Sequence, residues 1–173
     1  MQALAALGPP RLALQGAAQL LVLLHGLVGM ALCGACTHHV IVAVGYLRRP
    51  SAGTGLLRRV GLAKLYAWVT AGCYLATFVL GLLAYPTYRY FVRGLYFDWH
   101  QVWASNLFDI KENFAALGLP MALALLVMSR SLDPESDRTL VGPYVALVIA
   151  VAAVAWFAAL SGLLLTLQRG VPA

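Results

Sequence analysis

Three of the four histidines in this sequence lie in its first long apolar stretch: His25, His38 and His39. An ionisable side chain is costly to place in an apolar membrane stretch, so each of them is a candidate for function. His25 and His39 are 14 residues apart in the sequence. On a helix this spacing is about 40° short of four full turns, with a rise of about 21 Å. The two imidazoles are therefore predicted to share one helix face at different depths, whereas His38 points away from that face.

The His25 and His39 pair resembles the haem-ligating histidines of transmembrane b-type cytochromes, whose dihaem members carry two such residues at this spacing on one helix. Those cytochromes have a second helix with a matching pair, and the only histidine here outside the first apolar stretch is His100. The sequence is also similar to two families of small four-helix membrane proteins, the copper-resistance D type and the membrane protoporphyrinogen oxidase type. The matching features are His25 followed by Gly26 and Gly29, and a later span that begins near Lys111. The resemblance implies haem b and electron transfer.

Further residues are candidates for holding such a haem. Axial donors to haem iron are usually His and sometimes Met. His39 and Met121 lie at similar distances from the same end of their predicted spans, so Met121 is a candidate for the second ligand at His39. Arg89 and Arg93 follow the second span, where they are candidates to pair with the anionic propionates of a haem. The alternative is that the histidines form hydrogen bonds between helices.

A second group of polar residues surrounds the predicted start of the third span: Asp98, His100, Asp109, Lys111 and Glu112. A histidine beside carboxylates can exchange protons, which suits a quinone site because quinol oxidation releases protons together with electrons. His100, Asp109 and Glu112 are also candidate ligands for a metal ion such as zinc or copper. The alternative is structural, because acidic residues stabilise the positive N-terminal end of a helix dipole.

Small residues occur in the first and last apolar stretches. Cys33 and Cys36 form a CxxC sequence, which marks redox activity in many soluble proteins. Here it lies in mid-span without a second cysteine pair for exchange, so we interpret it as part of a packing groove. The last stretch carries small residues at multiples of four, among them Ala146, Ala150, Ala158 and Gly162. Such spacing lets helices approach closely, so this span is predicted to pack within the bundle or against another membrane subunit.

Composition identifies the environment of these residues. Of the 173 residues, 62% are hydrophobic and only 10% are charged, against about 25% charged in an average soluble domain. So few polar residues cannot cover the surface of a soluble protein. The apolar residues form four stretches, approximately 17–47, 61–84, 110–129 and 141–167, each about long enough to cross a hydrocarbon core. We therefore predict an all-α integral membrane four-helix bundle, with residues 1–173 forming a single transmembrane domain.

Residues 85–108 differ from these spans because aromatic and charged side chains alternate there. Phe91, Leu95, Trp99 and Trp103 recur every four residues. On a helix they would form one apolar stripe, which is typical of an element lying in the membrane interface. The sequence therefore predicts an additional aromatic interfacial segment between spans two and three.

Basic residues near the span ends predict the orientation of the chain in the membrane. The loop after the first span contains Arg48, Arg49, Arg58 and Arg59 without an acidic residue. We place this loop in the cytoplasm and both termini outside it, and we expect the bacterial inner membrane. The net charge of +6 is spread over both faces, which indicates contact with lipid headgroups rather than nucleic-acid binding.

Three functions follow from these residues. The first is a haem b protein that passes electrons to or from quinone or a partner subunit. The second is a non-catalytic accessory subunit of a larger membrane complex. The third is a small membrane enzyme or metal transporter that uses the outer histidine and carboxylate group. The first two are compatible, and we expect a membrane-embedded redox or anchor subunit.

Overall fold

The computed structural model describes residues 14–47, 54–133 and 136–171, with the side chains of 54–59 left out. All regular structure in this part of the chain is helical. Its elements are the 3₁₀ turn η1 (Gln15–Ala17), α2 (Ala18–Val44), α3 (Thr54–Tyr88), the π-helix η2 (Arg89–Phe97), α4 (Asp98–His100), α5 (Val102–Ser131) and α6 (Arg138–Gln168). The arginines 48, 49, 58 and 59, on which the predicted orientation depends, have side chains outside the described residues.

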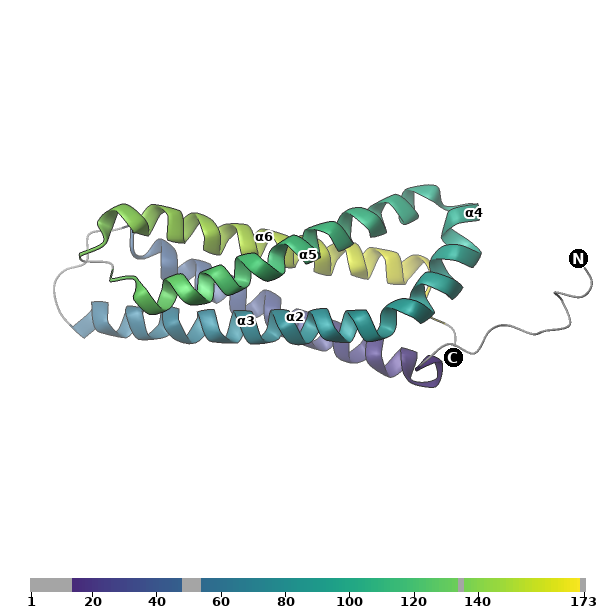
Figure 1. Cartoon of the computed structure of the whole chain (residues 1–173), viewed down its shortest axis with the longest axis horizontal. Helices are drawn as coiled ribbons and strands as arrows, with labels where there is room; N and C mark the ends of the chain where they lie inside the picture. The colour runs from purple at the N-terminus through teal and green to yellow at the C-terminus, as the bar shows by residue number, and fades with distance from the viewer. Residues whose placement is uncertain (1–13, 48–53, 134–135, 172–173) are drawn as a thin grey trace, which may run out of the picture.

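The four long helices run side by side as an antiparallel bundle (Figure 1). Contacts join α2 to α3, α3 to α5, α5 to α6 and α6 to α2, so the helices form a closed ring in chain order. One end of the bundle holds the start of α2, η2, α4 and the end of α6, and we call it the His25 end. The opposite end holds the end of α2 and the start of α6, and we call it the loop end.

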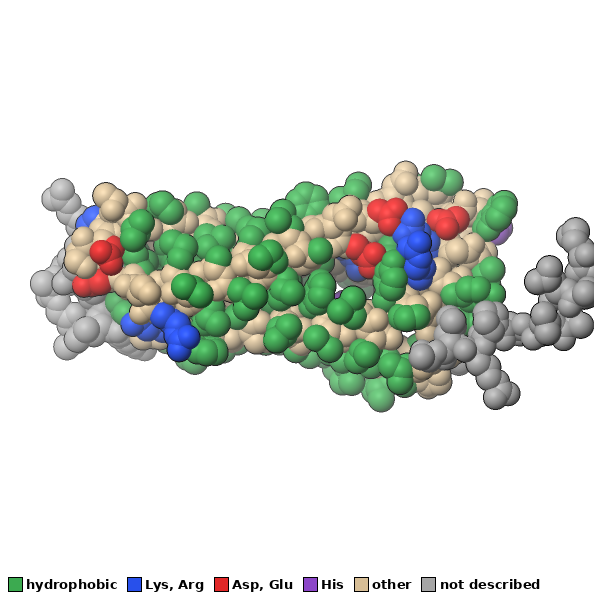
Figure 2. Space-filling view, in the orientation of Figure 1, with side chains coloured by type: hydrophobic (Ala, Val, Ile, Leu, Met, Phe, Trp, Pro, Cys, Tyr) green, Lys and Arg blue, Asp and Glu red, His purple; other side chains and the backbone are tan. Residues whose placement is uncertain are grey.

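Each long helix corresponds to one predicted span, which confirms the all-α four-helix architecture. All four are long and apolar enough to cross a membrane. On the face in Figure 2, charged side chains gather near the two ends, and mainly apolar side chains cover the middle. Many large apolar side chains are exposed along the bundle, among them Leu27, Ile41, Leu75, Leu117, Val127 and Leu160. This surface suits contact with lipid acyl chains.

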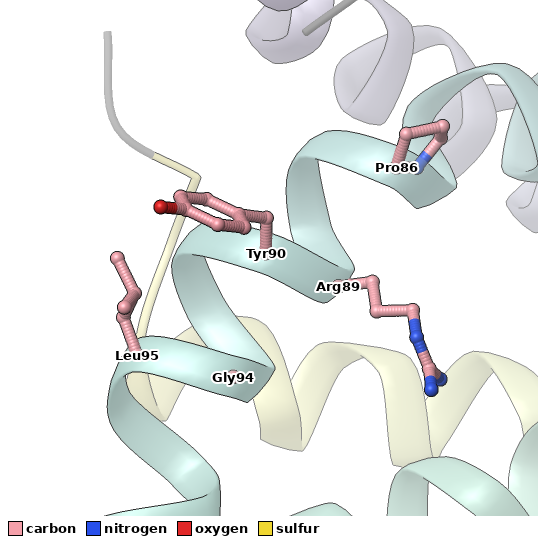
Figure 3. A pocket seen from close by; sticks show the side chains of 5 residues that line it. All are labelled: Pro86, Arg89, Tyr90, Gly94 and Leu95. Carbon is pink, nitrogen blue, oxygen red and sulfur yellow. The ribbon is translucent and has the colours of Figure 1, made fainter. Parts of the chain in front are cut away.

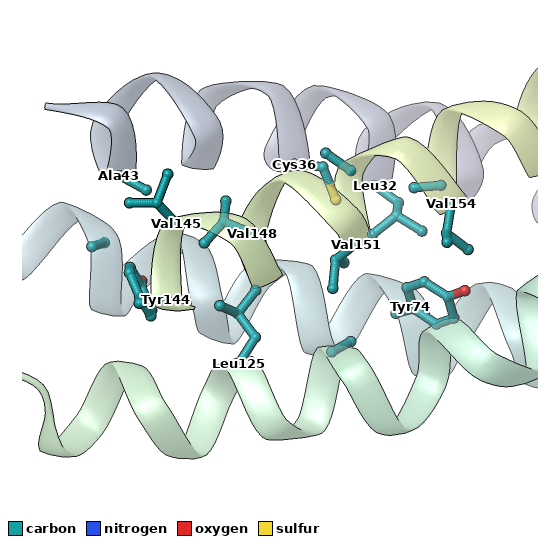
Figure 4. Close-up of a cluster of buried hydrophobic side chains, with 14 of the residues drawn as sticks. Leu32, Cys36, Ala43, Tyr74, Leu125, Tyr144, Val145, Val148, Val151 and Val154 are labelled. Carbon is teal, nitrogen blue, oxygen red and sulfur yellow. The ribbon is translucent and has the colours of Figure 1, made fainter. Parts of the chain in front are cut away.

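The buried core lies along the axis of the ring (Figure 4). Its labelled members are Leu32, Cys36, Ala43, Tyr74, Leu125, Tyr144, Val145, Val148, Val151 and Val154. Tyr74 from α3 crosses to α5, where its hydroxyl donates a hydrogen bond of 3.0 Å to the carbonyl of Ala115. Gly118 makes room for the phenol, because a Cβ at this position would lie 1.9 Å from Tyr74 Oη. Close approach of α3 and α5 therefore depends on one glycine.

The segment 85–108 is divided among continuous helices. α3 extends to Tyr88 and passes directly into η2, and α5 already begins at Val102. Within η2, Val92 and Phe97 are both fully buried. Their spacing of five residues matches the i→i+5 hydrogen bonding of a π-helix rather than the period of an α-helix.

The apolar stripe predicted for this segment faces away from the bundle. Leu95, Trp99 and Trp103 are 55%, 80% and 48% exposed, respectively. Phe91, the first member of the stripe, is half-buried. The four-residue repeat thus marks the outer surface of the segment, while its packing against the bundle follows the wider π-helical period.

Candidate functional site

His25 points from α2 towards α3 near one end of the bundle. Its Nδ1 lies 2.8 Å from the backbone carbonyl oxygen of Thr77. Gly81, one turn further along α3, leaves space for the ring, because a Cβ there would lie 3.1 Å from His25 Cε1. A carbonyl can only accept, so Nδ1 carries the proton and donates this bond. No described residue forms a hydrogen bond with Nε2, whose lone pair is therefore free.

This tautomer is the one that metal-binding histidines adopt. Such histidines commonly donate one ring N–H to a backbone carbonyl or a carboxylate and bind the metal through the other nitrogen. The bond to Thr77 also fixes the orientation of the imidazole. His25 is half-buried. Its side chain is therefore partly shielded from bulk solvent but still accessible to a ligand.

Lys111 and Glu112 approach the same end from α5. Lys111 Nζ lies 5.1 Å from the centre of the Phe108 ring, and its charge acts on His25. Glu112 interacts electrostatically with Lys111 and with Arg93. The two residues that carried the family resemblance, His25 and Lys111, are thus brought into one electrostatic environment by helices that are not sequence neighbours.

Arg93 joins three elements at this end of the bundle. Its guanidinium donates two hydrogen bonds to the Asp109 carboxylate on α5, one of them 2.8 Å long between Nη2 and Oδ2. Its Nε lies 3.6 Å from Asp98 Oδ1 on α4, and Ser105 donates a 2.5 Å hydrogen bond to the same oxygen. Arg93 therefore positions η2 against α4 and α5, and its charge is already matched by carboxylates.

Arg89 is the first residue of η2, four residues before Arg93, and it is exposed. Its Nη1 donates a 2.8 Å hydrogen bond to the Tyr85 hydroxyl. The described residues provide it with no carboxylate within salt-bridge distance, and Glu112 acts on it only at longer range, so Arg89 keeps a charge that an anion could match. Arg89 also borders an open hollow of about 410 Å³ on the surface of η2, lined in addition by Pro86, Tyr90, Gly94 and Leu95 (Figure 3).

Aromatic rings form the wall beneath these charges. Phe108 from α5 stacks on Tyr88 at 4.8 Å and on Tyr85 at 6.2 Å between ring centres. The Tyr88 hydroxyl is buried and has no hydrogen-bond partner within the described chain. The His25 end therefore combines a packed aromatic cluster with ionisable groups, and apolar surroundings with a few polar groups are typical of cofactor sites in helical bundles.

His39 lies in the other half of the bundle and is fully buried. Its Nε2 lies 2.8 Å from the Tyr144 hydroxyl on α6, and its ring stacks at 6.4 Å on Tyr66 of α3. A metal bound to Nε2 would have to replace the bond to Tyr144. Met121 is partly buried against the main core. The observed contact of His39 is the interhelical hydrogen bond that was the alternative to haem ligation.

The three predicted metal ligands are not assembled. His100 is exposed, with its Nδ1 3.0 Å from the Tyr96 carbonyl oxygen and its ring stacked on Tyr96 at 5.0 Å. Asp109 is bound to Arg93, whereas Glu112 faces the mixed charges described above. Within residues 14–47, 54–133 and 136–171, no group of three or more His, Cys, Asp or Glu side chains could hold a metal ion.

The cysteines of the CxxC sequence are buried free thiols in the core. Cys33 Sγ lies 3.7 Å from the Ala155 carbonyl oxygen of α6, and Thr37 accepts a 3.0 Å hydrogen bond from the Trp156 indole. This part of α2 thus packs closely against α6, in agreement with a packing groove.

The chain matches no protein-family model, and the curated proteins and the solved structures likewise contain no significant match. The site is therefore defined by its geometry alone. Thr77, Gly81 and Phe108 shape it, and they were not among the residues predicted for the site. Gly81 and Thr77 are spaced four apart on one face of span two, which is the only signal in the sequence that could have pointed to them.

Proposed function

We propose that this protein is an integral membrane protein that binds a b-type haem at the His25 end of its bundle. His25 is the axial ligand in this proposal, and the haem exchanges electrons with quinone or with a partner subunit. Bound there, haem would supply one-electron transfer. The supporting observation is the bond of His25 Nδ1 to the Thr77 carbonyl, which leaves Nε2 as a free donor for a metal.

The surroundings of His25 fit the other requirements of a haem. The rings of Tyr85, Tyr88 and Phe108 stack on one another at this end and make its interior apolar. Arg89 and Lys111 are cations that can pair with propionates, whereas Arg93 is held by Asp109 and Asp98. A second axial ligand is left out of the proposal, and five-coordinate haem b is compatible with a single histidine.

The proposed placement in the membrane follows the sequence. The His25 end faces the outside of the bacterial inner membrane together with both termini, and residues 48–59 with their four arginines face the cytoplasm. The exposed Leu95, Trp99 and Trp103 then lie at the outer interface, where aromatic side chains are favoured.

Absorption spectroscopy tests the haem proposal. The protein, expressed in a host supplied with haem and purified in detergent, should show a Soret band that is lost in His25→Ala. His38→Ala is the matched control, because His38 lies on the same helix and is exposed. It should retain the band, and so should His39→Gln. A colourless wild type would refute haem binding, and a spectrum lost in His39→Gln but kept in His25→Ala would refute the assignment to His25.

A second candidate function is that of an accessory subunit, supported by the outer surface of α6. A Cβ at Gly142 would meet no atom within 4 Å, and Ala146, four residues later on the same helix face, is exposed. The small residues at these positions therefore remain available to a helix of another subunit. Native mass spectrometry of the protein released gently from membranes would detect such a partner, and a monomer alone would refute this role.

A further inference from the structure

A basic and aromatic cluster lies near the loop end of the bundle, in the half opposite to His25. Its members are Lys64, Trp68 and Arg130, and we call it the Trp68 cluster. Lys64 and Trp68 belong to α3, and Arg130 is in the last turn of α5. The guanidinium carbon of Arg130 lies over the Trp68 ring, 5.1 Å from its centre. Lys64 precedes Trp68 by four residues, so the two side chains are neighbours on one side of α3.

The two positive charges of this cluster are not matched by carboxylates in the described part of the chain. Lys64, Trp68 and Arg130 are all exposed. No acidic side chain among the described residues lies within salt-bridge distance of either cation. Asp137, which follows α5, instead accepts a 3.0 Å hydrogen bond from the backbone N–H of Asp133. Cations from two different helices therefore stand beside one indole at the surface, where an anion could match both of them.

The position of Arg130 leaves its N–H groups available. An arginine in the last turn of a helix commonly donates to the free carbonyls of that turn. Arg130 crosses to Trp68 instead, and its guanidinium donates no hydrogen bond to any residue that the structure describes. The contact with the indole uses the charge of the guanidinium, whereas its planar array of donors can bind a phosphate through two N–H groups. Trp68 thus holds the guanidinium in place for an anionic ligand.

Apolar surface continues from the cluster towards the middle of the bundle. Gly72 lies one turn beyond Trp68, and a Cβ there would meet no atom within 4 Å, so there is open space beside the indole. Leu75 on α3 is 51% exposed, and Val127 and Leu123, one and two turns before the arginine on α5, are 65% and 48% exposed. A free inorganic anion would match only the charges. A phospholipid matches both parts, because its acyl chains favour apolar surface.

We propose that the Trp68 cluster binds the headgroup phosphate of an anionic phospholipid. Arg130 donates N–H groups to the phosphate oxygens, Lys64 supplies a second cation, and the acyl chains lie against the exposed apolar side chains of α3 and α5. A zwitterionic phospholipid carries its own cation next to the phosphate, so two protein cations favour a lipid with a net negative charge. In the membrane placement proposed above, the loop end faces the cytoplasm, and anionic lipids of the cytoplasmic leaflet attract basic residues.

Native mass spectrometry of the purified full chain in detergent tests this site. The probes are phosphatidylglycerol and phosphatidylcholine with identical acyl chains, and the chain should bind phosphatidylglycerol more tightly. Arg130→Gln should lower the affinity for phosphatidylglycerol about tenfold, because hydrogen bonds to a charged group are lost. Lys64→Gln should lower it about fivefold, the effect of one basic residue at a membrane surface. Both side chains are exposed, so a thermal melt without added lipid should show unchanged stability.

Arg169→Gln is the matched control. The Arg169 guanidinium carbon lies 4.8 Å from the centre of the Tyr96 ring at the His25 end. The substitution therefore removes the same charge and the same kind of contact from the other end of the bundle. Arg93, which precedes Tyr96 by three residues, is already held by carboxylates, so no second free cation assists Arg169 as Lys64 assists Arg130. Arg169→Gln should leave the tight binding of phosphatidylglycerol unchanged.

Three results would overturn the proposal. Equal affinity for the two lipids would exclude recognition of the net charge, and equal losses in Arg130→Gln and Arg169→Gln would indicate non-specific attraction. Displacement of the lipid by inorganic phosphate would show that the site takes a free anion, since inorganic phosphate has no acyl chains. A polypeptide that stays bound to the wild-type chain and is lost in Arg130→Gln would likewise assign the cluster to a protein partner. None of these measurements depends on haem, so they are independent of the test of His25.

Discussion

Gly118 provides the sharpest test of the packing between α3 and α5. An alanine Cβ at this position would lie 1.9 Å from Tyr74 Oη, 2.7 Å from Tyr74 Cζ and 2.9 Å from Val154 Cγ1, where contacting carbons normally stand about 3.5–4.0 Å apart. Gly118→Ala must therefore displace the Tyr74 ring. Its hydrogen bond to Ala115 would be lost as well.

The magnitude follows from three contributions to the free energy of unfolding. Overpacking costs about 2 kcal/mol, and loss of the Tyr74 hydrogen bond about 1 kcal/mol. The higher helix propensity of alanine offsets about 1 kcal/mol of this loss, because glycine is less favourable inside a helix. We therefore expect Gly118→Ala to lower the stability by about 2 kcal/mol, seen as a Tm about 5 °C lower in a thermal melt of the detergent-solubilised protein.

Two controls isolate the clash. Gly34→Ala places a methyl group on α2 where no atom lies within 4 Å, so only the helix propensity changes and the Tm should stay the same or rise. In a Tyr74→Ala background only the contact with Val154 Cγ1 remains, so adding Gly118→Ala should cost much less than it does in the native background. If Gly118→Ala melts at the same temperature as Gly34→Ala in the native background, the close approach of α3 and α5 described here is wrong.

Two further predictions concern the two halves of the bundle. Arg93→Gln removes the bridge between η2, α4 and α5, and hydrogen–deuterium exchange should become faster over residues 89–100. The stability cost should be only about 1 kcal/mol, because both carboxylate partners are about half exposed, and unchanged exchange would argue against the bridge. Leu125→Ala leaves a cavity at a side chain that is 1% exposed, and it should lower the free energy of unfolding by about 3 kcal/mol. Leu123→Ala, at a 48% exposed position of the same helix, should cost less than about 1 kcal/mol, and equal melting temperatures of the two variants would contradict the assigned core.

The sequence was sufficient to predict the four helices, because each apolar stretch is long and bounded by charges or prolines. The helix boundaries within residues 85–108 were harder to predict from the sequence. The mixed aromatic and charged residues of 85–108 predicted a separate segment after span two, yet α3 continues through Pro86 into a π-helix. Periodicity arguments assume 3.6 residues per turn. They selected the exposed Leu95 and Trp99 as a stripe for the membrane interface, and they gave no sign of Val92 and Phe97, which are buried against the bundle.

At the candidate site, some residues could be predicted from the sequence and others could not. Single residues such as His25 and Lys111 could be selected, because a charge or an imidazole in an apolar stretch is conspicuous in the sequence. Their partners could not be selected, because Thr77 contributes a backbone carbonyl and Gly81 contributes only the lack of a side chain. The Arg93–Asp109 pair was also missed: both residues had been named, but in different roles. Such pairings depend on how the helices turn about their axes, which hydropathy alone does not specify.

The π-helix η2 also determines where this chain can tolerate a change in length. Each π-type hydrogen bond closes a turn with one residue more than an α-type bond does. Deleting one residue within Arg89–Phe97 could thus be absorbed by a change from π to α hydrogen bonding. Inside α5 or α6 the same deletion would rotate every later side chain by about 100° around the helix axis. Insertions and deletions during evolution are therefore expected to accumulate in η2, while the four long helices keep their residue count.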